Sequence, residues 1–164
     1  LNPLAHLDPM GTLSFMIFGF GWGKPVPVNP YRLHGNMRPK RALVSIAGPL
    51  SNLVLAMLAA VPFRLGWLRL YGGPGSMSLQ SILMQFISIN LVLMLFNLIP
   101  FPPLDGSRVL AWLLPHDWAL KLERLEQFGG PGLMLGLYLL SRLGILSLVM
   151  SPLMRFMYRA LLVY

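Results

Sequence analysis

Two long uncharged segments constrain the fold of this chain more than any other feature. Residues 42–63 and 77–98 contain no Asp, Glu, Lys or Arg, and a helix of about 20 apolar residues can cross the hydrocarbon core of a bilayer. In lipid the backbone must satisfy its own polar groups, which only helices and closed barrels achieve. A third apolar segment, 131–150, holds Arg142 as its single charge. The sequence therefore predicts three membrane-spanning helices.

The composition supports this interpretation. Only 11% of the residues are charged, whereas a soluble domain carries about 25%. The net charge of +8 does not indicate nucleic-acid binding, because the basic residues lie between the apolar segments rather than among stacking aromatics. Membrane proteins place Lys and Arg there to set orientation and to meet anionic head groups. We therefore expect one domain over residues 1–164, an all-α, polytopic helical bundle in contact with membrane lipids.

Prolines predict where helices of this bundle are kinked or broken. Gly48-Pro49 lies inside the first apolar segment and should kink it, because proline removes a helical backbone donor. Ser151-Pro152 is expected to end the third segment. Residues 153–164 would then form an amphipathic tail at the membrane interface.

The first part of the chain is expected to be less regular. Residues 12–23 are uncharged but glycine-rich and short, so this segment should either re-enter the membrane or cross it as a short tilted span. Pro25 and Pro27 disfavour helix for the residues before them. An extended proline-rich stretch is therefore predicted at residues 24–30.

An acidic residue follows the second apolar segment, in a proline-rich run. The sequence of residues 97–106 is NLIPFPPLDG. A carboxylate near membrane depth is costly unless it is paired or bound to a cation, and Gly106 allows a tight turn directly after it. Two interpretations of Asp105 remain open: a rigid loop that presents it to a cation, or an interfacial turn with a solvated carboxylate.

Three other polar residues stand out next to apolar sequence. Asn52 lies inside the first apolar segment, where its amide can join two helices or donate to a developing oxyanion. His6 and Asp8 are two residues apart and would point to the same side of an extended segment. They can ligate a metal or orient each other, or lie solvated in a turn.

Taken together, these motifs resemble those of the site-2 protease family of intramembrane zinc metalloproteases, in its compact bacterial branch. Residues 48–52 resemble the family's Gly-Pro-x-x-Asn signature, and residues 97–106 match Asn-x-x-Pro-x-x-Pro-x-Asp-Gly. The runs His6-Leu7-Asp8-Pro9 and 21–28 are also similar. The fixed positions of the second motif are Asn97, Pro100, Pro103, Asp105 and Gly106. The likeness extends over about the first two thirds of the chain.

The resemblance implies a zinc endopeptidase that cleaves transmembrane or membrane-associated proteins. Asp105 would be the third protein ligand of the zinc, and Asn52 would polarise the scissile carbonyl or stabilise the oxyanion. It also implies a multi-pass protein of the bacterial inner membrane with its active site toward the cytoplasm, the side that the basic residues of 24–41 indicate. Residues expected to shape the site are Asn97, Pro100, Pro103, Gly48, Pro49, Pro25 and Pro27, with polar support from His6 and Asp8.

The chain departs from the family at the first two zinc ligands and the general base. The family takes these from a His-Glu-x-x-His helix, whose histidines share one face and whose Glu activates water. His6, His34 and His116 do not form this motif. We therefore expect that helix to precede Leu1 in a longer protein, which binds zinc, and we expect the 164 residues alone to lack zinc and activity.

A non-catalytic protein is the alternative hypothesis. The same sequence features fit a membrane scaffold or pseudoprotease. They also fit a small transporter whose broken helices bind an ion.

Overall fold

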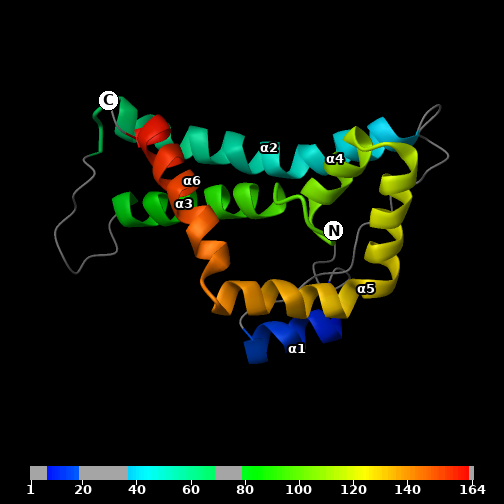
Figure 1. The fold of residues 1–164 in the computed structure, drawn as a ribbon. Helices are drawn as coiled ribbons and strands as arrows, with labels where there is room; N and C mark the ends of the chain where they lie inside the picture. The colour runs from blue at the N-terminus through cyan, green and yellow to red at the C-terminus, as the bar shows by residue number, and fades with distance from the viewer. Residues whose placement is uncertain (1–6, 19–36, 69–78, 163–164) are drawn as a thin grey trace. The chain divides into compact units, whose positions relative to one another are not determined.

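The computed structural model describes residues 7–18, 37–68 and 79–162, and most residues of these ranges are helical (Figure 1). Two compact units divide the chain, Leu1–Met37 and Arg38–Tyr164. The all-α fold class is confirmed. The described helices are α1 (Pro9–Phe18), α2 (Met37–Arg64), α3 (Leu79–Asn97), α4 (Asp105–Leu113), α5 (His116–Arg142) and α6 (Ile145–Leu162).

The first unit contains α1, which begins with a cap. The backbone N–H of Gly11 donates to Asp8 Oδ1 at 3.1 Å, and Pro9 occupies the first helical position, where its missing N–H costs nothing. Ten residues of helix measure about 15 Å. Residues 12–18 of the predicted segment 12–23 lie in this helix, and residues 19–23 and the extended stretch predicted at 24–30 lie outside the described residues.

The core of the second unit joins α2, α3 and α6. The residues that α2 contributes to this core include two alanines, Ala56 and Ala60. Larger side chains of α3 and α6 fill the remaining space. The buried cluster consists of Ala56, Ala60, Phe63, Ile87, Leu91, Leu161 and Leu162.

The end of α6 is attached to α2 and α3 by polar contacts. Arg64 Nε donates to the carbonyl of Leu161 at 2.8 Å, and its Nη2 donates to the carbonyl of Ala160. The last carbonyls of a helix have no partner within the helix, and a cation there also complements the helix dipole. Tyr158 Oη donates to Ser88 Oγ on α3 at 2.6 Å. These bonds fix where α6 ends.

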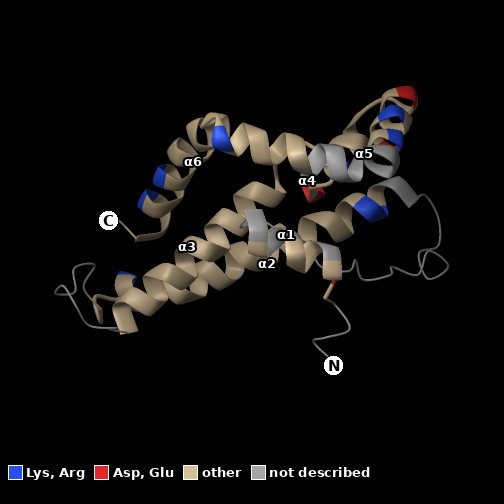
Figure 2. Cartoon of the chain, turned by 90° about the horizontal axis from the view of Figure 1, so that it is seen from below, with Lys and Arg blue, Asp and Glu red and all other residues tan. Residues whose placement is uncertain are grey.

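Three described helices are long and apolar enough to cross a membrane: Pro39–Arg64, Leu79–Asn97 and Ile145–Leu162. Figure 2 shows Lys and Arg near the two ends of α2 and none along α3. The first two helices cover most of the predicted segments 42–63 and 77–98. Pro49 does not end α2, which continues through it.

The third predicted segment is not one helix. Residues 131–150 were expected to form a single span that ends at Ser151-Pro152, but the helix break lies earlier. Gly144 has a φ of +77°, a left-handed conformation that ends helices and that glycine adopts without strain. Pro152 lies inside α6, and residues 153–162 are the second half of this helix rather than a separate tail.

The attachment of α6 can be tested with an Arg64→Met variant. Methionine keeps an apolar stem but removes both hydrogen bonds, so we expect a loss of about 1 kcal/mol in unfolding free energy. Thermal unfolding in detergent micelles measures it. Arg155→Met is the matched control, because Arg155 Nε makes only a long 3.4 Å bond within α6. Equal losses in the two variants would contradict the role given to Arg64.

Candidate functional site

Asp105 lies at the first turn of α4, directly after the proline-rich loop. The loop is closed by backbone bonds, among them Leu104 N–H to the carbonyl of Phe101 at 3.0 Å. Pro102 and Leu104 are buried. Ser107 Oγ, also buried, donates back to the carbonyl of Leu104 at 2.7 Å. Packing and these bonds therefore hold the start of α4 in one position.

Gly106 sets how close α4 comes to the end of α3. A Cβ atom at this position would overlap the carbonyl oxygen of Leu98 and lie 2.5 Å from that of Ile99. The atoms that it would meet belong to the backbone, which cannot move aside as the end of a flexible side chain can. The glycine after Asp105 therefore allows a close approach that no other residue permits.

The carboxylate of Asp105 lies against α2 at Gly48. A Cβ atom on Gly48 would be 3.7 Å from Asp105 Oδ2, which is van der Waals contact. Pro49, the next residue, is buried. The Gly-Pro-x-x-Asn motif inside the first apolar segment and the acidic motif at the end of the second therefore lie next to each other.

Asn52 lies on the same face of α2 as Gly48, one turn further along. Residues four apart on a helix are neighbours on one face, and α2 runs without interruption through both positions. The Asn52 side chain is half-buried. The Asn52 amide therefore lies about 6 Å along the axis of α2 from Gly48, the residue beside the Asp105 carboxylate.

The other predicted site residues fall into three groups. Asn97 is the last residue of α3 and is half-buried, while Pro100 is exposed and Pro103 half-buried in the loop. Asp8 caps α1 in the first unit. Outside the described residues lie His6, Pro25 and Pro27.

Sequence reasoning missed the basic partner of Asp105. Arg108 Nη1 lies 3.9 Å from Asp105 Oδ1, and the side chains are 47% and 33% exposed. An ion pair this long and this exposed is worth about 0–1 kcal/mol. The spacing of three residues on a helix could have suggested it. The carboxylate is thus accessible and only weakly neutralised by this arginine.

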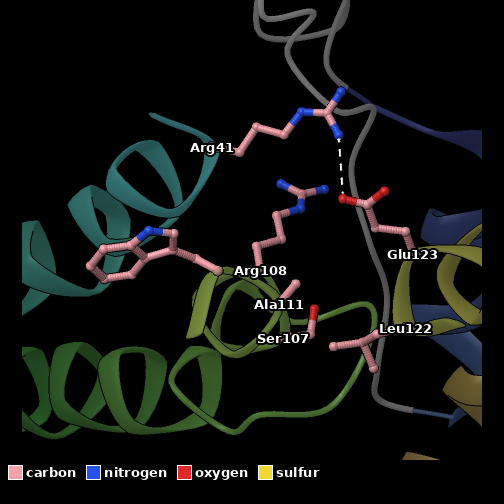
Figure 3. A pocket seen from close by; sticks show the side chains of 7 residues that line it. Arg41, Ser107, Arg108, Ala111, Leu122 and Glu123 are labelled. Atoms are coloured by element: carbon pink, nitrogen blue, oxygen red, sulfur yellow. Dashed lines mark ion pairs between the residues drawn. The ribbon is translucent and has the colours of Figure 1, made fainter. Parts of the chain in front are cut away.

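A pocket adjoins this pair, where α2, α4 and α5 meet. Figure 3 shows Arg41, Arg108 and Glu123 pointing toward one another, and Arg41 Nη1 lies 3.8 Å from Glu123 Oε1. The sequence placed Arg41 in one polar connection and both Arg108 and Glu123 in another, and it gave no sign that the two connections meet. The lining residues are Arg41, Ser107, Arg108, Ala111, Trp112, Leu122 and Glu123.

The described residues can supply one protein ligand of a metal site. No group of three or more His, Cys, Asp or Glu that could hold a metal occurs within residues 7–18, 37–68 and 79–162. Asp105 can supply one carboxylate oxygen, a common zinc ligand. Gly48 has no side chain to fill the space beside that oxygen.

Comparison with known proteins adds independent information. The model of Peptidase family M50 matches residues 70–126. "Putative zinc metalloprotease YwhC" of Bacillus subtilis (strain 168) is 45% identical over 133 residues, covering 79% of this chain and 59% of that protein. "Putative zinc metalloprotease Rip2" of Mycolicibacterium smegmatis is 30% identical over 132 residues, 79% of this chain and 49% of that protein.

An archaeal protein is also similar. "Putative zinc metalloprotease MJ0611" of Methanocaldococcus jannaschii is 33% identical over 112 residues, covering 68% of this chain and 53% of that protein. The chain thus spans about half to three fifths of the length of the curated relatives it matches. No solved structure matches the chain.

The close approach at Gly106 can be tested with Gly106→Ala. The added methyl group must push α4 away from the end of α3, so we expect a loss of about 3 kcal/mol in unfolding free energy. Gly136→Ala is the control, because a Cβ atom there meets nothing within 4 Å. That change within α5 should be neutral or stabilising by up to about 1 kcal/mol. Denaturant unfolding in micelles measures both changes in stability. Equal unfolding free energies of the two variants would contradict the close packing at Gly106.

Proposed function

Because the chain belongs to peptidase family M50, the site-2 protease family, we propose that it forms part of an intramembrane zinc metalloendopeptidase. The position of the Asp105 carboxylate beside Gly48 carries the proposal. It joins the acidic motif to the Gly-Pro-x-x-Asn motif beside two helices apolar enough to cross a membrane. The names of the relatives support zinc and proteolysis.

Asp105 is the residue of this chain that would hold the metal. Its carboxylate is partly exposed, and packing of Gly106 on the end of α3 fixes the backbone that carries it. Zinc, when bound, supplies Lewis acidity to a peptide carbonyl and makes water more acidic. The other two protein ligands and the general base would come from a His-Glu-x-x-His helix outside these 164 residues.

Asn52 would act on the substrate rather than on the metal. Its half-buried amide lies on the face of α2 that meets Asp105. An N–H donor held there can stabilise the scissile carbonyl oxygen as it gains charge, since the surrounding helices already fix its direction. Asn97, Pro100 and Pro103 would keep the loop and its carboxylate in place.

The substrate we propose is a transmembrane or membrane-associated protein, presented in an unwound conformation. A helical substrate hides its carbonyls in its own hydrogen bonds, so it must open before cleavage. Pro25 and Pro27 would help guide the extended segment. The proposed location is the bacterial inner membrane with the site toward the cytoplasm, in line with the basic residues of 24–41. The 164 residues alone would be inactive.

Zinc content of the full-length protein tests the ligand role of Asp105. Asp105→Asn keeps the shape but removes the charge, so zinc affinity should fall by more than the roughly 10- to 100-fold that loss of an outer partner costs. Asp117→Asn, an exposed acid in the first turn of α5, is the matched control. Unchanged zinc content in Asp105→Asn would remove this residue from the ligand set.

Turnover of a membrane substrate tests the role of Asn52. Asn52→Ala in the full-length enzyme should lower kcat by about 100- to 1,000-fold, as loss of one oxyanion donor does, with zinc content unchanged. Ser51→Ala is the control, since Ser51 is exposed and bonds its own helix. Full turnover in Asn52→Ala would show that the amide only joins helices.

A further inference from the structure

The pocket where α2, α4 and α5 meet has no part in the proposed mechanism. It holds about 430 Å³ of space, part of which is open to solvent, and this is within the usual range of small-ligand sites. Its charged lining residues are Arg41, Arg108 and Glu123, which point toward one another (Figure 3). Two guanidinium groups and one carboxylate leave the lining with one positive charge in excess.

The two arginines can bind an anion in addition to their present partners. Arg41 Nη1 lies 3.8 Å from Glu123 Oε1, and Arg108 Nη1 lies 3.9 Å from Asp105 Oδ1. Both distances exceed the 2.7–3.2 Å or so of an N–H···O hydrogen bond. A guanidinium group has five N–H donors, so one distant carboxylate does not saturate it. The planar donor groups of arginine match the oxygens of a phosphate.

The pocket lies at the level of the lipid head groups. The candidate span Pro39–Arg64 has 26 residues and measures about 39 Å, about 9 Å more than the hydrocarbon core of a bilayer. Arg41 is the third residue of this span and therefore lies in the head-group layer. Trp112, which also lines the pocket, is 49% exposed, and Trp118 at the start of α5 is 61% exposed. Tryptophan is enriched at this level of membrane proteins.

We propose that this pocket binds the head group of a phospholipid that carries both a phosphate and a primary ammonium, as phosphatidylethanolamine does. The phosphate lies between Arg41 and Arg108, and the ammonium donates to the carboxylate of Glu123. Basic pockets between membrane helices are suited to lipid head groups. The carboxylate gives selectivity, because the methylated nitrogen of a choline head group has no N–H to donate. The bound lipid joins α2, α4 and α5 at the membrane surface.

Lipid binding by the purified full-length protein tests the proposal. Native mass spectrometry from detergent micelles would measure the affinities for phosphatidylethanolamine and phosphatidylcholine with identical acyl chains. The two lipids share the phosphate and the net charge and differ only in the N–H donors. We expect about 10-fold tighter binding of phosphatidylethanolamine, the effect of one hydrogen bond to a charged group. Equal affinities, or no retained lipid, overturn the proposal.

Three variants assign the binding to individual side chains. Glu123→Gln keeps the shape but removes the charge, so the two lipids should bind equally. Arg41→Met should weaken both lipids about 10-fold, because it removes a charged donor to the phosphate. Arg124→Met is the matched control, an exposed arginine of α5 outside the lining, and should change neither affinity. An unchanged preference in Glu123→Gln, or equal weakening by the two arginine variants, contradicts a specific site.

Competition distinguishes a lipid from other anions. Inorganic phosphate and a soluble acidic peptide, each at the concentration of the lipid, should leave phosphatidylethanolamine bound, since neither supplies acyl chains and an ammonium together. Displacement by phosphate would make the pocket a site for the free ion. Displacement by the peptide would make it a site for a protein partner. Either result overturns the lipid assignment.

Discussion

The close contact between Gly106 and the end of α3 is the constraint on which the candidate site depends. The backbone at Gly106 packs directly on the carbonyls of Leu98 and Ile99, so α4 starts where α3 ends and cannot slide along it. Asp105 is the residue before this contact. The Asp105 carboxylate is therefore held in one position, beside Gly48 on α2. A Cβ atom at Gly106 would prevent this approach, whereas one at Gly48 would be in ordinary van der Waals contact with Asp105 Oδ2.

The face of α2 that meets α4 differs from the rest of the helix. Arg41, Ser45, Gly48 and Asn52 recur every three or four residues on it, whereas the deeper part of the helix buries Ala56 and Ala60 against α3 and α6. An apolar solvent penalises each of these polar groups unless it has a partner. The structure supplies partners from α4 and α5 for the charged residues. Arg64 at the far end of α2 likewise pairs with the carbonyls that end α6.

The sequence predicted the helical class and the two uncharged helices because the requirement to satisfy the backbone in lipid is local. It misplaced the third helix. Hydropathy continues across residues 131–150, but the chain turns at Gly144, and one glycine among apolar residues gives little signal. The pairing of Arg108 with Asp105 was predictable from helical spacing. The meeting of Arg41 with Glu123 was not, since it depends on how α2 and α5 are arranged.

By itself, the sequence determined which residues were candidates for chemistry. An acid after three prolines and an asparagine within an apolar helix are costly in lipid unless each has a partner, a bound cation or access to water. Only the tertiary structure decided that Asp105 lies at Gly48, one turn from Asn52, and that Arg41, Arg108 and Glu123 line one pocket. Spacing along a chain fixes faces within a helix, whereas distances between helices depend on the side chains that pack between them.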